Sequence, residues 1–180
     1  VENTMCAIRA ASGLFQRIYA STTFLGMGER AGNAETEKVI MNLYLHYGVK
    51  KYENMLGKLK EAADFIKYAT GVTIPPNKAI VGDYAFAHES GIHTHGVINN
   101  PATYEPFPPE LVGNTRRLTI GKQSGKAVID YKIKMILGRT VNDRQLDSVV
   151  QRVREIYENG RKASLREEEF RKILQDVGLT

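Results

Sequence analysis

The stretch that decides the predicted fold class is residues 19–33, YASTTFLGMGERAGN. Its first half is aromatic and β-branched and stops at Gly26, which is typical of a buried strand. A glycine-rich turn follows, and Asn33 is placed to cap a helix that Gly48 would end. Residues 3–12 can form a helix before the strand. This order of helix, strand, loop and helix indicates a slice of an α/β structure, because one buried strand cannot make a sheet alone.

The chain beyond this slice divides at a proline pair. We predict a helix from about Leu56 to Ala69, closed by Gly71, and Pro75–Pro76 then marks a boundary. Residues 1–74 are therefore expected to form one unit, made of the predicted strand and the helices that pack on it.

The rest of the chain is expected to form two smaller subdomains. Residues 75–118 are a loop-rich subdomain in this interpretation, with short strands at 78–82 and 116–121. Residues 119–180 form a mainly helical subdomain, because apolar residues recur there with helical spacing. These residues are Leu146, Val149, Val150, Val153, Ile156 and Tyr157, followed by Phe170, Ile173, Leu174 and Val177.

The last predicted helix has a start signal of its own. Ser164 and Glu167 stand three residues apart, which is the spacing of a capping box. We therefore expect this helix to begin at Ser164.

Composition predicts a globular protein of the cytoplasm. The 180 residues are 42% hydrophobic and 25% charged, and no apolar run approaches the roughly 20 residues of a membrane span. A single cysteine, Cys6, excludes an internal disulfide, and the first residues do not resemble a signal peptide. The chain begins with Val rather than Met, so we expect a fragment or a processed subunit.

The basic charge is concentrated in the last third of the chain. Residues 1–113 carry 10 basic and 11 acidic side chains, whereas residues 114–180 carry 15 and 9. A basic region can attract nucleic acid or the phosphates of a nucleotide-bearing substrate. Charges of both signs alternate here and few aromatic residues interleave, so a solvated helical surface is the favoured interpretation.

Two glycine-rich motifs fail as nucleotide-binding sites. GMGERAGN at 26–33 has the spacing GxGxxxG instead of GxGxxG, and IGKQSGKA at 120–127 lacks both the phosphate-loop spacing and its Ser or Thr. The first motif remains a polar turn that presents Glu29, Arg30 and Asn33. Barrel enzymes place catalytic groups at such turns, although a purely structural turn is the alternative.

Proton-handling side chains gather in residues 91–109, GIHTHGVINNPATYEPFPP. The segment contains two histidines, a tyrosine and four prolines, and it has no helical or strand period, so we expect irregular backbone. Loops carry function where a scaffold positions them. On its own, Tyr104 is as well explained by packing against the prolines as by chemistry.

The histidines of this region allow three interpretations. His88, Glu89, His93 and His95 suggest a metal site, but the spacing H-x4-H-x-H matches no closed zinc motif. Structural histidines and acid/base chemistry are the other two interpretations.

Three elements together resemble one enzyme family. GMGERAGN, then FAHESGIHTHGVINNPATYE at 86–105 and GKQSGK at 121–126, are similar to the acyl-CoA-condensing synthases of the isopropylmalate, homocitrate and citramalate group. The resemblance implies the last helix, strand and helix of a (β/α)8 barrel, followed by small α+β and helical linker subdomains. It also implies an acyltransferase that condenses acetyl-CoA with a 2-oxoacid, and the shorter homocitrate-type members are favoured.

The resemblance assigns roles to four residues. His93 and Tyr104 match the histidine and tyrosine that transfer protons, and Glu29 matches a glutamate near the substrate. Asn33 matches an asparagine beside the metal. His88 is expected to be structural, and His95 has the weaker claim to a role.

The same resemblance implies that part of the active site lies on other residues. The acidic element and the HxH pair that hold the family's divalent metal, Zn, Mg or Mn, do not occur here. We therefore expect no complete metal site and no activity on this chain alone. A missing barrel half, in the same polypeptide or in a separate subunit, and a homodimer that exchanges the catalytic arm are the implied partners.

A non-enzymatic module is the rival hypothesis. In that case a helical and loop domain would bind a partner through its basic C-terminal surface. We expect neither nucleic acid nor a membrane as partner.

Overall fold

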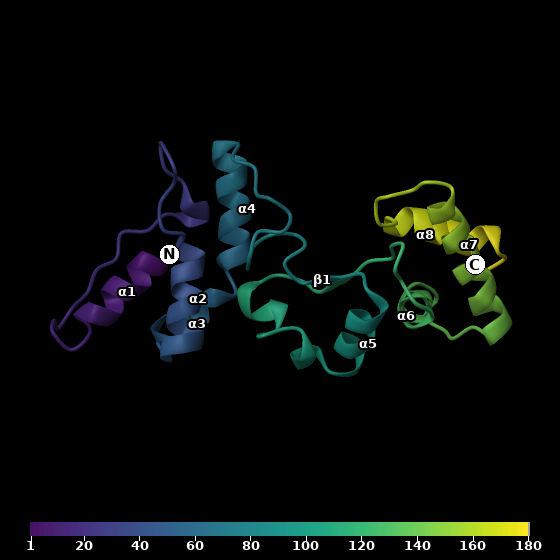
Figure 1. Ribbon diagram of the computed structural model, residues 1–180, viewed down its shortest axis with the longest axis horizontal. Coiled ribbons are helices and arrows are strands. Elements are labelled where there is room, and N and C mark those ends of the chain that lie inside the picture. Colours follow the sequence, from purple (N-terminus) through teal and green to yellow (C-terminus); the bar gives the residue numbers. More distant parts are fainter. Residues whose placement is uncertain (180) are drawn as a thin grey trace. The chain divides into compact units, whose positions relative to one another are not determined.

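The computed structural model describes residues 1–179, and these residues are mostly helical (Figure 1). The two strands named among them, β1 (Ala87–His88) and β2 (Arg117–Leu118), pair in parallel, with Ala87 opposite Arg117 and His88 opposite Leu118. The chain separates into two units. Unit 1 comprises Val1–Ala85 and Pro109–Thr115, and unit 2 comprises Phe86–Pro108 and the chain from Arg116 onward. The three-part division expected from the sequence stays a prediction.

Unit 1 is built from four α-helices and three single 3-10 turns, coloured purple to blue in Figure 1 except for its late segment. The helices are α1 (Glu2–Ala11), α2 (Thr36–Tyr47), α3 (Glu53–Leu56) and α4 (Leu59–Thr70), and the turns are η1 (Phe24–Gly26), η2 (Lys50–Tyr52) and η4 (Pro109–Val112). Gly48 and Gly71 end α2 and α4 in the left-handed conformation, which confirms both predicted stops.

Unit 1 buries a modest apolar core. Its buried hydrophobic residues are Met5, Val39, Met41, Leu56, Leu59, Ala63, Val81 and Val112. Buried Asn114 fastens the loop before it, because its side-chain amide donates to the Ile80 and Gly82 carbonyls at 2.9 and 3.0 Å. Ile80 has φ of 72°, so the strand predicted at 78–82 is wrong, and this loop turns instead of extending.

The strand predicted at residues 19–26 is also wrong. Tyr19 is 85% exposed, Phe24–Gly26 form the 3-10 turn η1, and Leu25 has φ of 59°. Thr23 alone pairs with Glu35, in an isolated bridge. A β-branched segment becomes a strand only when a neighbouring strand pairs its backbone groups, and no named strand of residues 1–179 lies in unit 1.

Asn33 does not cap α2, contrary to prediction. The helix begins at Thr36, with Glu35 before it, and the Asn33 amide donates to the Met27 carbonyl at 2.8 Å. Asn33 thereby closes the glycine loop on itself. An Asn side chain can bond nearby loop backbone as readily as a helix start, and the loop provides the acceptor here.

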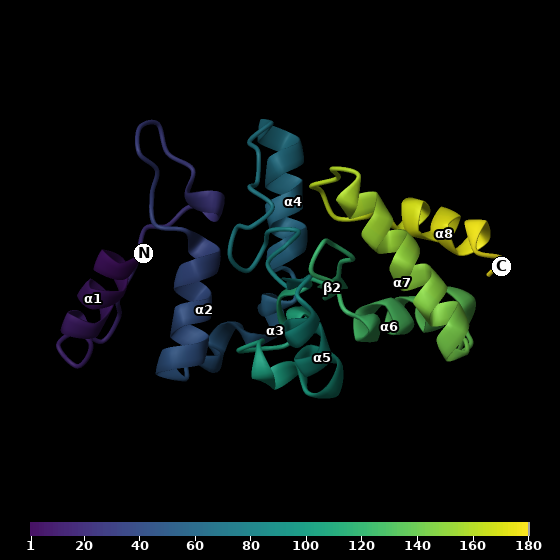
Figure 2. The ribbon, with the colours of Figure 1, turned by 45° about the vertical axis from the view of Figure 1, so that its right-hand side comes forward.

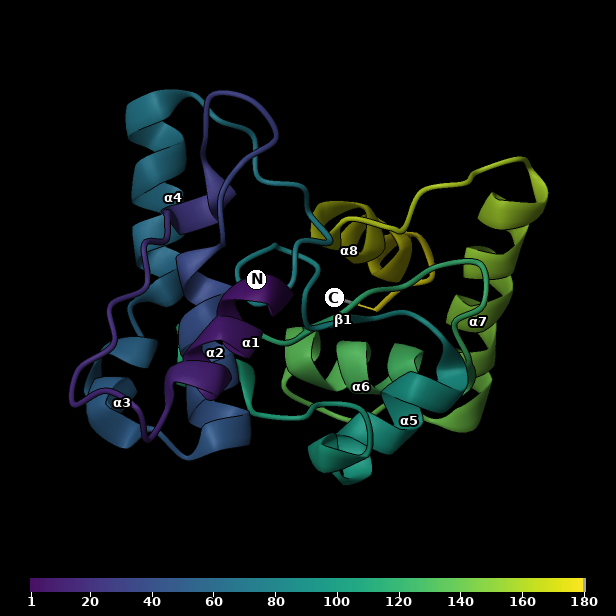
Figure 3. The same cartoon turned by 60° about the vertical axis from the view of Figure 1, so that its left-hand side comes forward.

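Unit 2 packs three long helices around one apolar core. These are α6 (Lys126–Leu137), α7 (Asp143–Glu158) and α8 (Glu167–Asp176), drawn green to yellow in Figure 2. Unit 2 also contains the shorter helix α5 (Gly91–Asn99) and the 3-10 turn η3 (Pro101–Thr103). Helix α5 packs on α6, as Figure 3 also shows. The mainly helical character predicted for residues 119–180 is confirmed.

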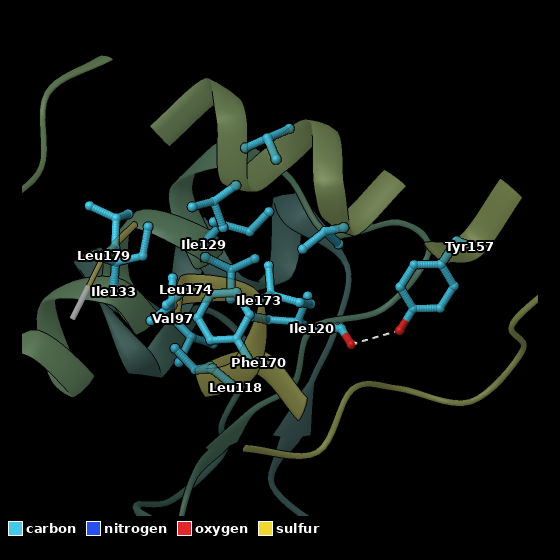
Figure 4. Close-up of a cluster of buried hydrophobic side chains, with 14 residues drawn as sticks. Val97, Leu118, Ile120, Ile129, Ile133, Tyr157, Phe170, Ile173, Leu174 and Leu179 are labelled. Carbon is cyan, nitrogen blue, oxygen red and sulfur yellow. Dashed lines mark hydrogen bonds between the residues drawn. The ribbon is translucent and has the colours of Figure 1, made fainter. Parts of the chain in front are cut away.

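The core of unit 2 collects side chains from every one of its helices longer than a single turn (Figure 4). Val97 comes from α5, Ile129 and Ile133 from α6, and Phe170 and Leu174 from α8. All of the residues predicted from helical spacing contribute to this core or pack against it. The Tyr157 hydroxyl also donates to the Ile120 carbonyl at 2.9 Å, which ties α7 to the chain after β2.

The start of α8 differs from its prediction. The helix begins at Glu167, and Glu169 instead of Ser164 organises its first turn. The Glu169 carboxylate accepts from the Arg166 backbone at 2.8 Å and from Arg161 at 2.9 and 2.7 Å, which lowers its pKa to about 2. By contrast, α7 begins with a capping box between Asn142 and Gln145.

The strand predicted at 116–121 is confirmed only over the two residues of β2. No helix within residues 1–179 combines the length and the apolar character that crossing a membrane requires.

We predict that Ile133→Ala lowers the free energy of unfolding of unit 2 by about 2–5 kcal/mol, because it leaves a cavity in the core. Ile133 is 0% exposed, whereas Met135, two residues along the same helix, is 67% exposed. Met135→Ala is the matched control and should change stability by less than about 0.5 kcal/mol. Native-state hydrogen exchange of amides in α6 to α8 measures both. Equal losses in the two variants would contradict the assigned core.

Candidate active site

The segment predicted as irregular backbone contains a helix. Gly91–Asn99 form α5, and this part of the prediction is wrong. Two glycines in nine residues disfavour a helix by roughly 1 kcal/mol each. The helix forms because Thr94 and Val97 lie on one face and are buried, and because Thr94 Oγ1 donates to the Ser90 carbonyl at 3.0 Å.

His93 lies on the exposed side of α5, in its first turn. The next residue, Thr94, is buried. Because consecutive helical residues do not share a face, the His93 side chain points away from the core that buries Thr94. The fold thereby holds the imidazole where a bound molecule can reach it.

Tyr104 brings its ring against His93. The ring centroids are 4.4 Å apart and the ring planes are inclined by 43°. Gly96 makes this approach feasible, because a Cβ at that position would lie 2.7 Å from the Tyr104 ring. The two residues that the sequence singled out for proton transfer are therefore neighbours.

Both polar groups of the pair are open to a ligand. Tyr104 is 42% exposed, and His93 is also exposed. Among residues 1–179, no hydrogen-bond partner is found for the His93 imidazole or the Tyr104 hydroxyl. An imidazole and a phenol in contact, with free donors and acceptors, can exchange protons with a bound molecule.

A buried carboxylate lies behind the pair. Glu105 is 5% exposed and accepts two hydrogen bonds from Arg116, at 2.7 Å from Nε and 2.6 Å from Nη2. His88 Nε2 lies 3.3 Å from the same carboxylate. Burial by itself raises the pKa of Glu105, but the hydrogen bonds and charges of Arg116 and His88 outweigh it, so the pKa lies below its ordinary value.

Glu89 links the start of α5 to the helical part of unit 2. Its carboxylate accepts from the Ser164 hydroxyl at 2.8 Å and occupies the space where a side chain at position 121 would lie. The Ser124 hydroxyl accepts from the Gly121 amide at 2.9 Å and lies 3.2 Å from the Glu89 carbonyl. The GKQSGK element is thus a turn that supports the chain leading to His93.

His88 and His95 are not grouped with His93 around a common point. The His88 side chain is 11% exposed and contacts Glu105, whereas His95 is exposed and pairs with Asn99 at 3.0 Å on its own helix. These contacts give each of the two histidines a local structural partner.

Glu29 and Asn33 lie in unit 1, on the glycine loop. Glu29 is exposed in the bend of this loop. Behind it, buried Glu37 accepts from the Leu25 amide at 3.1 Å, and Lys78 Nζ lies 3.7 Å from the other Glu37 oxygen. The loop therefore projects Glu29 from a backbone that a buried carboxylate holds.

The described residues do not by themselves fit a divalent metal. Within residues 1–179, no group of three or more His, Cys, Asp or Glu side chains is arranged so that it could hold a metal ion. Asn33 offers at most one carboxamide oxygen, whereas zinc and magnesium take roughly four and six ligands.

Sequence reasoning missed Glu105 and Arg116, and it assigned Ser164 to a helix cap instead of to Glu89. Glu105 follows Tyr104 directly, so the sequence placed it near the site, but nothing in the pattern YEPF separates a buried glutamate from a solvated one. Ser164 lies 75 positions from Glu89, and its partner becomes apparent only in the folded unit.

One family model matches residues 80–161, and it is described as "Homocitrate synthase post-HMGL domain-like". The matched segment contains both residues of the exposed pair and the buried carboxylate behind it.

Curated relatives from Methanocaldococcus jannaschii extend the similarity over more of the chain. A 2-isopropylmalate synthase is 40% identical over 98% of this chain and 33% of its own length. The (R)-citramalate synthase CimA is 44% identical over 80% of this chain and 29% of its own, and the homocitrate synthase AksA is 43% identical over 87% and 38%. The chain thus spans about a third of the length of these relatives, and over that part it is similar to homocitrate, isopropylmalate and citramalate synthases.

Proposed function

We propose that this chain supplies acid/base residues to an enzyme that condenses acetyl-CoA with a 2-oxoacid. The observation that carries the proposal is the exposed His93–Tyr104 pair, with ring centroids 4.4 Å apart, inside the segment that matches the family model. Homocitrate synthase-like activity is the favoured form, and isopropylmalate or citramalate synthesis are the alternatives. The relatives of similar identity include all three types.

The condensation of acetyl-CoA with a 2-oxoacid requires both a base and a proton donor. A base must remove a proton from the methyl group of acetyl-CoA, so that this carbon can attack the ketone carbon of the 2-oxoacid. The carbonyl oxygen then becomes an alkoxide and takes up a proton, after which water hydrolyses the thioester. A histidine with a pKa near neutrality can accept the first proton, and a neighbouring tyrosine can donate the second.

Glu29 completes the proposed set as a group that orients or relays protons to His93. Its exposed position on the glycine loop supports access to a substrate. Asn33 is proposed to lie beside the metal of the complete enzyme, whose ligands we assign to residues outside this chain. The metal would make the carbonyl carbon of the 2-oxoacid a better electrophile.

The complete enzyme is proposed to contain a barrel, of which residues 1–74 form the last part. We further propose a homodimer in which α5 and the Tyr104 loop act at the barrel of the partner subunit. The exposure of both side chains supports this arrangement, because neither needs to move to reach a second molecule.

The rival binding-module function would use the basic surface of unit 2, part of whose charge is paired within the unit. Lys126 pairs with Asp147, Lys134 with Asp130, and Arg171 with Glu167. These pairs neutralise part of the basic charge, although 15 basic side chains still stand against 9 acidic ones in residues 114–180.

We predict that His93→Ala and Tyr104→Phe each lower kcat of the complete enzyme by roughly 10²-fold or more, the usual range for a lost acid/base group. The KM for the 2-oxoacid should change little, because neither group is assigned to its binding. His95→Ala, on the same helix, is the control and should have a far smaller effect. Steady-state kinetics measures all three, and near-normal kcat in His93→Ala would end the catalytic assignment.

We predict that activity returns when two differently inactivated chains are mixed. A His93→Ala subunit and a subunit inactivated at the metal ligands of the barrel should form heterodimers in which one complete site remains. Activity is measured after co-expression with two affinity tags. Isolated heterodimers without activity would refute the exchange between subunits and leave the assigned chemistry intact.

We predict that the 180-residue chain alone retains less than one equivalent of any divalent metal, since its described side chains provide no adequate ligand set. Elemental analysis after purification without chelators measures the content. One full equivalent of zinc, lost in the double variant His93→Ala and His95→Ala, would instead favour a metal-binding module.

A further inference from the structure

The polar side chains behind the His93–Tyr104 pair lead to an inference that rests on the proposed function and deepens it. We propose that Glu105, held by Arg116 and His88, is a positioning residue that keeps the Tyr104 ring over His93. Glu105 itself need not touch a substrate, because its carboxylate is buried behind the exposed ring.

The first step of the argument is the turn that carries both residues. Tyr104 is 42% exposed and Glu105 is 5% exposed, although they are consecutive. Their backbone amides both donate to the Pro101 carbonyl, at 3.1 and 3.0 Å. The turn therefore acts as one short rigid piece, and a fixed Glu105 side chain fixes the backbone from which the Tyr104 ring projects.

The second step is where Glu105 is anchored. The two hydrogen bonds from Arg116 form a planar fork, which restrains the orientation of the carboxylate as well as its position. Arg116 directly precedes β2 and His88 lies on β1, and these two strands pair with each other. The loop of Tyr104 is thus fastened from two directions to the same pair of strands.

The third step connects this anchor to His93. The chain passes from His88 on β1 through Glu89 and Ser90 directly into α5, where His93 is the third residue. One small sheet therefore positions both the helix of His93 and the loop of Tyr104. The two rings make no hydrogen bond of their own among residues 1–179, so their separation depends on these backbone anchors and on the close packing of the Tyr104 ring at Gly96.

The fourth step is the cost of moving away. A buried carboxylate that loses its cationic partner is strongly destabilised, so few loop positions other than the observed one are accessible. A neutral amide at position 105 removes the charge that binds the Arg116 fork while it preserves the size of the side chain. Glu105→Gln should therefore loosen the turn without emptying the space it fills.

The first test measures geometry and needs no activity. In the 180-residue chain, NMR cross-relaxation between the His93 and Tyr104 ring protons should be clear, and Glu105→Gln should weaken it at least about twofold. Arg116→Lys, which retains the charge and loses the fork, should weaken it as well. Glu158→Gln and Arg154→Lys, at exposed positions of α7, are the matched controls.

Signals from the α6 to α8 core serve as the check on folding. If the Glu105→Gln variant loses these core signals, it is unfolded, and the Arg116→Lys variant provides the test instead. Arg116→Lys keeps a cation beside Glu105 and so leaves no uncompensated charge. Unchanged ring-to-ring cross-relaxation in a folded variant of either residue would overturn the proposal.

The second test measures coupling in the complete enzyme. Glu105→Gln should lower kcat by about tenfold to a hundredfold with little change in KM, as expected for a displaced catalytic group. In a Tyr104→Phe background the same change should lower kcat by less than about twofold, because the hydroxyl it positions is already absent. If Glu105→Gln lowers kcat by the same factor in the wild-type and the Tyr104→Phe enzyme, Glu105 does not act through Tyr104 and the proposal is overturned.

The two tests separate this inference from the proposed function. If Tyr104→Phe leaves kcat unchanged, the proposed acid/base role of Tyr104 fails. The ring-to-ring signal then decides alone whether Glu105 positions the tyrosine. If Tyr104→Phe is inactive but Glu105→Gln is not, the function stands and the positioning role is refuted.

Discussion

The strongest constraint on the candidate site is the ion pair between the buried Glu105 carboxylate and the partly exposed Arg116. Removing a carboxylate from water costs several kcal/mol, and the cost is offset only when geometry and hydrogen bonding are good. The Arg116 fork, at 2.6 and 2.7 Å, provides that geometry, and His88 adds a third contact. Because the carboxylate has no equally favourable place elsewhere, the turn that carries it is held against β1 and β2.

A second buried carboxylate has a comparable part in unit 1. Glu37 is 0% exposed and accepts the amide of Leu25, a residue in the left-handed conformation that is costly for a side chain of its kind. The glycine loop with Glu29 and Asn33 starts directly after this point. In both units, therefore, a glutamate that faces inward restrains a segment that presents polar side chains outward. Loops that must hold chemistry at a defined place need such anchors, because they lack the regular backbone bonding of helices and strands.

The pairing of His93 with Tyr104 was expected from the family resemblance of the sequence, whereas the roles of these residues stay predictions. His93 and Tyr104 are separated by eleven positions, and the structure brings their rings into contact. Their environment could not be predicted in the same way. The helical state of Gly91–Asn99 conflicts with the local preference of two glycines, and it results from burying Thr94 and Val97 against the rest of unit 2.

The sequence by itself determined the helices of unit 2 whose apolar residues recur with a regular period, together with the glycine stops at Gly48 and Gly71. These features depend on neighbours within one or two helical turns, so the local order of residues suffices to specify them. Only the tertiary structure decided the state of residues 19–26, the course of α5 and the burial of Glu105. A strand requires a partner strand, a glycine-containing helix requires a surface to pack on, and a buried charge requires its counter-ion. Each of those partners comes from a part of the fold that local sequence does not specify.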